Sequence, residues 1–188
     1  YHIPVAVGLL TPEGKDVMLG HGAVTQALNL TQERQQFVFE NVDELPVPSL
    51  LRGFSAPVKL EYPYSLEQLV FLMQHDSDGF NRWDAAQQLA VHLMQQLIGD
   101  YRAGRELQLN PALVEAYRKV LTNPELDKAM VSKILTLPSE AYLSELAEEI
   151  DVEAIHYVRK FVRKTLAIQL QSEFRQVYNA NQISEPYN

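Results

Sequence analysis

The sequence contains no cysteine, and this absence excludes several kinds of chemistry. Disulfide frameworks, thiolate nucleophiles and cysteine-ligated zinc sites all require that residue. A cysteine-free chain is compatible with a reducing compartment. Basic residues are also scarce: 16 Lys and Arg face 24 Asp and Glu, for a net charge of -8. This balance argues against binding to nucleic acid, because phosphate contacts need a basic surface.

Long apolar runs are missing as well. No stretch approaches the roughly 18 apolar residues that span a bilayer, so we expect no membrane span. The start, YHIPVAVGLL, has no basic segment and no small-residue cleavage site, which argues against a signal peptide. It also lacks an initiating Met, and the end, NQISEPYN, has neither a helix cap nor a closing strand. We therefore expect both ends to be cut from a longer chain.

Common catalytic and nucleotide-binding motifs are absent too. None of the five histidines begins H-E-x-x-H, and there is no G-x-S-x-G, P-loop or G-x-G-x-x-G. The acidic run at residues 145–153 is typical of a solvated patch before a helix. The basic run RKFVRK at residues 159–164 predicts an amphipathic helix with a solvated cationic face, and anion binding is the alternative. No catalytic residue and no metal ligand is predicted.

The first sixty residues have the period of β-strands. Alternation is clear at Val5, Val7 and Leu9, and again at Leu28 and Leu30. A further strand is predicted around residues 37–39 after a turn at residues 31–34, and an extended stretch runs over residues 47–62. These four or five strands indicate an antiparallel sandwich, although they are few for a complete one.

From Ser65 onward the period becomes helical. Ser65 and Gln68 form a predicted capping box, and a long helix is expected from about residue 82 to residue 103. Asn-Pro pairs at residues 110–111 and 123–124 indicate two more helix starts, and Ser139 and Asp151 indicate further ones. About six helices, several of them short, predict a superhelix of stacked helical hairpins without a fixed sequence repeat.

The stretch HDSDGFNRWDAAQQL (residues 75–89) gathers acidic residues, one His and the only Trp. A calcium loop needs Gly at its sixth position and a closing Glu, and neither is present. Zinc needs more nitrogen ligands than one His supplies. We interpret the stretch as a joint between two helices, with Asn81 capping the second helix, Asp84 in its first turn and Trp83 at the head of its apolar stripe.

Three segments resemble the bacterial aminopeptidase N family of zinc-dependent alanyl aminopeptidases, in the gluzincin superfamily. They are PVPSLLRGFSAPVKLEY (residues 46–62), LMQHDSDGFNRWDAAQQL (residues 72–89) and, more weakly, YNAN (residues 178–181). The resemblance extends over essentially the whole chain. It implies an immunoglobulin-like third domain that lacks its first strands, followed by the opening of the α-helical fourth domain.

The resemblance also implies which chemistry this chain lacks. In that family the zinc ligands, the G-A-M-E-N motif and the catalytic tyrosine belong to the second domain, and no position here matches them. We therefore expect zinc only in the missing catalytic domain of a longer parent, which would be the main partner, with peptides as the parent's substrates and a bacterial cytoplasmic location.

The resulting prediction is an α+β multi-domain fragment. A partial Ig-like β-sandwich is expected at residues 1–62, and the start of an armadillo- or HEAT-like helical domain at residues 63–188. The segment would scaffold the parent and restrict substrate access, with Arg52, Phe54, Arg82 and Trp83 as candidates for the joint between the two domains. The alternatives are a stand-alone module that binds a peptide or protein in its groove, and, more remotely, a complete enzyme with an unrecognised site.

Overall fold

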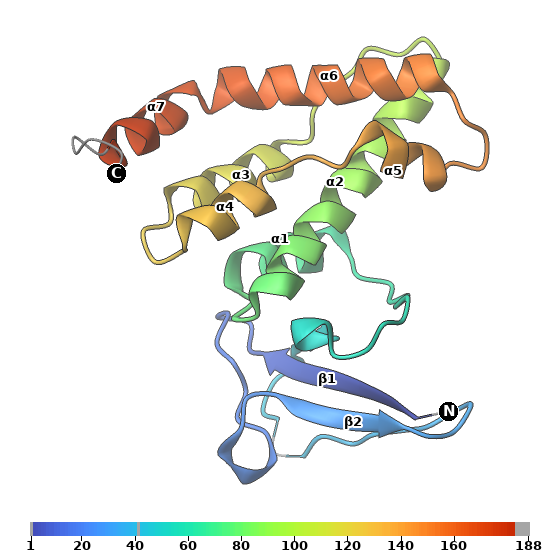
Figure 1. Cartoon of the computed structure of the whole chain (residues 1–188), viewed down its shortest axis with the longest axis vertical. Coiled ribbons are helices and arrows are strands. Elements are labelled where there is room, and N and C mark those ends of the chain that lie inside the picture. The colour runs from blue at the N-terminus through green and yellow to red at the C-terminus, as the bar shows by residue number, and fades with distance from the viewer. Residues whose placement is uncertain (1, 41, 183–188) are drawn as a thin grey trace, which may run out of the picture. The chain divides into compact units, whose positions relative to one another are not determined.

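Three strands form one antiparallel sheet in the first part of the chain (Figure 1). The computed structural model describes residues 2–40 and 42–182. The chain divides into an N-terminal unit, residues 1–86, and a C-terminal unit, residues 87–188. The sheet belongs to the first of these. Its central strand, β1 (Ile3–Leu10), lies between β2 (Gln26–Leu30) and β3 (Val47–Leu50).

The register of the sheet follows the predicted alternation. Val5 pairs with Leu28 across β1 and β2, and Leu9 pairs with Pro48 across β1 and β3. Val7, Leu9 and Leu19 form the buried cluster of the sheet, and Val5 and Leu28 are among the residues packed against it. The apolar face predicted from Val5, Val7 and Leu9 is therefore confirmed.

Two predicted strand segments are wrong. Residues 36–40 form no strand, although Phe39 packs against the sheet cluster. Phe37 and Phe39 alternate because both turn toward the interior and are half-buried. A strand also needs a neighbouring strand for its hydrogen bonds, and half-burial of side chains does not supply one. The stretch over residues 47–62 is a strand only as far as Leu50, because Leu51 is left-handed (φ 57°) and the short 3₁₀ helix η2 (Arg52–Phe54) follows. The described residues thus contain three strands.

Seven α-helices follow the sheet in the described part of the chain, one more than predicted. They are α1 (Leu66–His75), α2 (Gly79–Arg102), α3 (Pro111–Thr122), α4 (Lys128–Ile134), α5 (Glu140–Glu145), α6 (Val152–Gln169) and α7 (Gln171–Ala180). Within the C-terminal unit, α3 contacts α4 and α7, and α6 contacts α5 and α7 (Figure 1). Helix α1 and the first turns of α2 belong to the N-terminal unit.

Most predicted helix starts are confirmed. The Ser65–Gln68 capping box is complete, and the side chains of Asn110, Ser139 and Asp151 accept hydrogen bonds from the first turns of α3, α5 and α6. These caps satisfy amide groups that the helix itself leaves without acceptors. The predicted start at residues 123–124 is wrong. Those residues form a turn, in which the side chain of Asn123 accepts from the amide of Glu125, and α4 begins after the Asp127 cap.

The apolar stripes of the long helices are also as predicted. In the C-terminal unit, α2 buries Leu89, Leu93 and Leu97, and the helix at residues 152–169 buries the apolar side of its wheel. That buried side consists of Ala154, Ile155, Val158, Val162 and Leu166. Burial of these faces is the main source of stability in these helices, because helix stability in proteins comes mostly from the packing of an amphipathic face.

Candidate functional site: a buried polar joint in the N-terminal unit

The chain bends sharply where β3 ends, at the predicted joint. Leu51, Gly53 and Phe54 all have left-handed backbone angles, with φ values of 57°, 63° and 53°. This conformation costs a non-glycine residue roughly 1–2 kcal/mol, so it persists only where surrounding contacts fix it. Two contacts here are the Phe54 amide donating to the Leu51 carbonyl (2.9 Å) and the Gly53 amide donating to Asp78 Oδ2 (2.9 Å).

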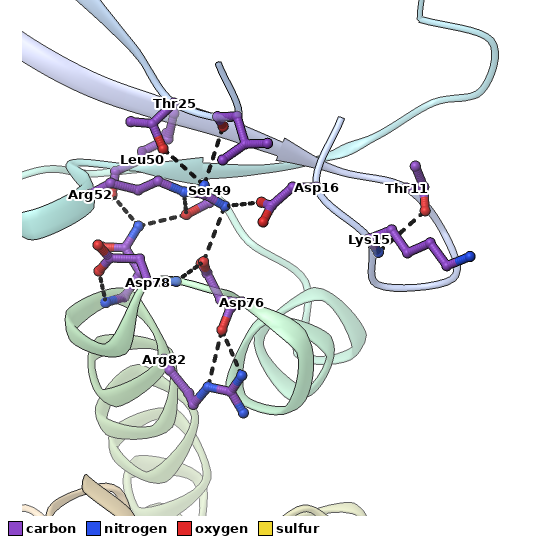
Figure 2. Close-up of polar contacts among 12 residues, drawn as sticks. Thr11, Lys15, Asp16, Thr25, Ser49, Leu50, Arg52, Asp76, Asp78 and Arg82 are labelled. Carbon is purple, nitrogen blue, oxygen red and sulfur yellow. Dashed lines mark hydrogen bonds and ion pairs between the residues drawn. The ribbon is translucent and has the colours of Figure 1, made fainter. Parts of the chain in front are cut away.

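Arg52 lies at the centre of the bend with only 4% of its side chain exposed. Its guanidinium makes five polar contacts, which matches its five N–H donors. Nε donates to Ser49 Oγ (2.8 Å), and Nη1 donates to the Val24 carbonyl (3.3 Å) and Thr25 Oγ1 (3.1 Å). Nη2 donates to Asp16 Oδ1 (2.7 Å) and Asp76 Oδ1 (3.2 Å). One side chain thus joins the sheet, the loop before β2 and the turn after α1 (Figure 2).

The space for this guanidinium comes from Gly8 in the central strand. A Cβ atom at position 8 would lie 2.0 Å from Arg52 Cζ and 2.3 Å from Arg52 Nε. No side chain can occupy that volume while Arg52 keeps its place. The glycine is therefore required by the close approach of Arg52 to the strand, and not by a special backbone angle.

Asp76, between α1 and α2, is fully buried. Its Oδ1 accepts from Arg52 and from the Asp78 amide (2.9 Å), whereas Oδ2 has no hydrogen-bond partner among the described groups. Burial raises the pKa of this carboxyl, and the nearby Ser49 hydroxyl, the Asp78 amide and the charge of Arg52 oppose that rise only in part. Asp76 is thus a buried acid with one oxygen poorly satisfied.

A second buried arginine, Arg82 of α2, caps the C-terminal end of α1 with its side chain. Its Nη1 donates to the Gln74 carbonyl (2.9 Å), and its Nε and Nη2 donate to the Asp76 carbonyl (3.1 and 2.7 Å). Carbonyls at the end of a helix lack partners within it, and a cation there also complements the helix dipole. Burial lowers the pKa of Arg82, and the nearby charge of Asp76 opposes that shift.

Asn81 does not cap the second helix, contrary to the prediction. Asp78 caps it, because Asp78 Oδ1 accepts from the Asn81 amide (2.9 Å), and the helix begins at Gly79, three residues earlier than predicted. The Asn81 side chain instead donates to Ser49 Oγ and to the Leu50 carbonyl, both at 2.8 Å. It therefore fastens the first turn of α2 to β3. The predicted acidic residue in that first turn is also wrong, because Asp84 lies beyond it.

The four predicted joint residues separate into two groups. Arg52 and Arg82 lie within the buried polar network, whereas Phe54 and Trp83 each contact Phe80, with ring centroids 5.3 and 5.6 Å from that of Phe80. Phe54 is 53% exposed, so this aromatic row reaches the surface of the N-terminal unit. Whether these residues join two domains stays a prediction, as does the domain boundary at residues 62 and 63.

Sequence reasoning missed the partners of Arg52. Asp16, Ser49 and Asp76 were not proposed as site residues, and neither was Gly8. Their only local signal is the Asp76–Asp78 pair at the end of α1, which also suits an ordinary turn. The predicted helix–turn–helix joint at residues 75–89 is present.

The described residues hold neither a candidate metal site nor a helix that could span a membrane. Over residues 2–40 and 42–182, no group of three or more His, Asp or Glu side chains is arranged to hold a metal ion. The buried carboxylate of Asp76 and that of Asp16 instead face the Arg52 guanidinium. Among the helices of these same residues, none is long and apolar enough to cross a membrane.

Comparison with known families assigns a class to each part of this fold, the sheet and the helices that follow it. Residues 1–63 match the family described as a domain of unknown function (DUF3458) with an Ig-like fold. Residues 66–188 match the family described as a domain of unknown function (DUF3458_C) with ARM repeats. The second match covers more than half of the chain, so the chain belongs to the DUF3458_C family, and the predicted fold class is confirmed.

The resemblance to bacterial aminopeptidase N is confirmed as well. Aminopeptidase N of Escherichia coli (strain K12) is 45% identical over 98% of this chain. The protein of the same name from Haemophilus influenzae is 36% identical over 94% of this chain. A crystal structure of Legionella pneumophila aminopeptidase A in complex with aspartic acid matches the whole chain with a TM-score of 0.81 and 34% identity. In each case the chain spans 21% of the relative's length.

Proposed function

We propose that this chain is a non-catalytic, architectural segment of a zinc-dependent aminopeptidase that removes N-terminal residues from peptides. The observation that supports this most directly is the small share of the relative's length that this chain matches. The E. coli relative matches 98% of this chain, yet the match takes up only 21% of that protein. The sequence of this chain contains no H-E-x-x-H, so the zinc and the reaction would belong to the remaining part of such an enzyme.

The side chains of this segment do not suit a catalytic zinc ion. A catalytic zinc site takes three protein ligands and leaves one position open for water. Here the Arg52 guanidinium pairs with the partly exposed carboxylate of Asp16 and the buried carboxylate of Asp76. His156 pairs with Glu140 (3.0 Å), and His92 lies exposed beside Gln96. We therefore assign no catalytic step and no metal ligand to this chain.

The proposed role is to set shape and access. A scaffold must keep its elements in one geometry, and directional hydrogen bonds to a buried guanidinium specify geometry more narrowly than apolar contact does. In this proposal Arg52 and Arg82 fix the sheet against the first two helices, and Phe54 and Trp83 belong to the surface next to the joint. The partner would be the catalytic part of the same polypeptide, in the bacterial cytoplasm.

The test compares the chain with a longer protein. The purified 188-residue chain, supplied with zinc, is assayed on alanyl-nitroanilide beside the protein translated from the complete reading frame. We expect turnover only from the longer protein, whose added sequence should contain H-E-x-x-H. Turnover by the 188-residue chain that is abolished by one substitution within it would overturn the proposal in favour of a complete enzyme.

A second candidate function is a stand-alone module that binds a peptide. The observation in its favour is a groove of about 760 Å³ in the C-terminal unit, lined by α3, α4 and α7. Its apolar walls include Leu121, Val131, Leu135, Phe174 and Val177. A start codon immediately before Tyr1, together with retention of peptides by the purified chain, would favour this function over the scaffold.

A further inference from the structure

The basic run at residues 159–164 is not used by the proposed function. Its cations lie on α6, and among contacts between described residues only Arg159 makes a hydrogen bond, from Nε to the Pro138 carbonyl (2.7 Å). Within the described residues, Arg163 makes no ion pair or hydrogen bond. Two acidic groups on adjoining elements are engaged elsewhere, because Glu140 pairs with His156 and Glu173 with Arg118 (both 3.0 Å). The guanidinium of Arg163 is therefore available to an anionic ligand, although the chain as a whole has a net charge of -8.

A pocket of about 270 Å³ lies beside this helix, wholly within the C-terminal unit. Arg159 and Arg163, one helical turn apart, both line it. Opposite walls come from α3, the connection after α4, and α7. They are largely apolar and include Leu135, Leu137 and Phe174, and Leu166 adds an apolar contact from α6 itself. Pockets for drug-sized ligands range from about 300 to 1,000 Å³, so this one suits a smaller molecule.

Tyr117 also lines the pocket and lacks a partner. The residue is 2% exposed, and its hydroxyl has no hydrogen bond to any described group. A buried hydroxyl without a partner costs free energy, and this is unusual in native structures. Burial also raises the pKa of the phenol, so it stays a neutral donor at physiological pH. The Tyr117 hydroxyl therefore lacks an acceptor for its proton, and a carboxylate oxygen of a ligand would supply one.

We propose that this pocket binds a small monocarboxylate with an apolar body, such as a hydrophobic acyl-amino acid. The guanidiniums of Arg159 and Arg163 would receive the carboxylate, and the Tyr117 hydroxyl would donate to it. Leu137, Leu166 and their apolar neighbours would enclose the body. Arginine matches a carboxylate in a two-bonded geometry, and charge-assisted bonds of this kind are about twice as strong as neutral ones.

A carboxylate with an apolar body is favoured over inorganic phosphate by the walls of the pocket. Phosphate has no apolar part and would leave these walls without contact. An apolar body fills them while its carboxylate faces the guanidiniums. This inference is independent of the proposed scaffold role and stands or falls separately from it.

The test is titration calorimetry on the complete 188-residue chain with N-acetyl-leucine, N-acetyl-leucinamide and inorganic phosphate. We expect N-acetyl-leucine to bind with a Kd on the order of a millimolar, as is usual for about a dozen non-hydrogen atoms. The amide, which is neutral, should bind at least about tenfold more weakly, since it loses the charge-assisted bonds. No detectable binding of N-acetyl-leucine, or equal binding of the amide or of phosphate, would overturn the proposal.

Matched variants locate the binding. Arg163→Gln should weaken N-acetyl-leucine about tenfold, whereas Lys164→Gln removes the same charge from the same helix outside the pocket walls and should change the Kd less than about twofold. Equal effects of the two variants would mean that general charge, and not the pocket, attracts the ligand. If Arg163→Gln fails to fold by circular dichroism, Arg163→Lys, which keeps the charge and loses the planar fork, takes its place.

Tyr117→Phe gives a signature that a purely structural role would not. Removal of an unpaired hydroxyl should leave the melting temperature of the free chain unchanged or raised. The same variant should bind N-acetyl-leucine several-fold more weakly, because the donor to the carboxylate is lost. A lowered melting temperature together with unchanged affinity would show that the hydroxyl serves the fold and would remove it from the site.

Discussion

The two units of this chain use different means to fix their geometry. All five buried polar or charged residues among the described positions lie in the N-terminal unit, and they are Ser49, Arg52, Asp76, Asn81 and Arg82. The buried side chains described for the C-terminal unit are apolar, apart from the hydroxyl of Tyr117. The first unit therefore combines an apolar core with directional bonds to buried charged groups, whereas the second relies on the apolar faces of amphipathic helices.

This difference matters because the two kinds of interaction fail differently. Apolar packing degrades gradually, in proportion to the volume removed. A buried ionic network contributes little net stability when complete, yet removal of one member leaves a charge without its partner in a region of low polarity. We therefore expect the N-terminal unit to be the more sensitive to single polar substitutions, and hydrogen exchange followed on peptides from each unit separately can measure this.

The largest effect is expected from Arg52→Met. This change leaves Asp16 and the fully buried Asp76 without their guanidinium, at a cost of about 3–5 kcal/mol in the free energy of unfolding. Urea unfolding followed by Trp83 fluorescence, which reports on the N-terminal unit, measures the loss. Lys59→Met is the control, because its ion pair with Glu61 is more than 80% exposed on both sides and should contribute nothing measurable. A loss below about 1 kcal/mol for Arg52→Met would contradict the comparison.

A comparable apolar test in the C-terminal unit is Leu113→Ala. Leu113 on α3 is fully buried, and its truncation should cost about 2–5 kcal/mol through lost burial and the cavity left behind. Circular dichroism at the helical minimum during urea unfolding measures this change. Ile168→Ala on α6, where the side chain is 63% exposed, should stay within about 0.5 kcal/mol. Equal losses for the two variants would mean that burial does not determine stability here.

Gly8→Ala probes the network from the side of the strand. The added Cβ would lie 2.0 Å from Arg52 Cζ, so the guanidinium must move, at a cost of about 1–3 kcal/mol. The matched control is Gly99→Ala on the exposed side of α2, where a Cβ meets nothing within 4 Å and should stabilise the chain by about 0.5–1 kcal/mol. The same Gly-to-Ala change should therefore lower the free energy of unfolding at position 8 and raise it at position 99. A Gly8→Ala variant that keeps its stability with Arg52 in place would refute this prediction.

The acid Asp76 adds a pH dependence to the same network. Burial raises its pKa in the folded state above 3.8, so the folded state binds this proton more tightly than the unfolded state does. Between the unfolded and the folded pKa values, this group therefore lowers the free energy of unfolding as pH rises. Asp76→Asn removes that dependence, so its stability relative to the unaltered chain should improve from pH 4 upward. Urea unfolding of both proteins at several pH values measures the difference, and a constant difference would contradict the raised pKa.

The features that could be predicted from the sequence are local ones. The capping box at Ser65 and Gln68 depends on residues three apart, and so do the caps at Ser139 and Asp151. Apolar stripes such as that of α6 depend on spacings of three and four. Where two local signals compete, the prediction fails: Asn123 before Pro124 suits a turn as well as a helix start, and Asp127 supplies the cap instead.

The buried network could not be predicted in the same way. The partners of Arg52 lie between 3 and 36 residues away, on the sheet, on a loop and after α1. No periodic pattern connects such positions, and from sequence alone an isolated Arg next to a Gly is predicted to be exposed to solvent. The resemblance led to Arg52 and Arg82 as joint residues, but their burial, and the need for Gly8, follow only from the three-dimensional contacts.

The smallest effect is expected at a helix cap in the C-terminal unit. Ser139 Oγ accepts from the Tyr142 amide (3.1 Å) at the start of the six-residue helix α5. Ser139→Ala should cost about 1 kcal/mol, because the amide loses its acceptor, and Ser139→Asp should recover most of that loss by offering a charged oxygen near the positive end of the helix dipole. Hydrogen exchange of peptides covering α5 measures the local change, while peptides covering β1 should be unaffected if the caps act only within their own unit. Faster exchange in β1 would show that local and directional stabilisation are coupled, and the contrast between the two units would then be one of degree only.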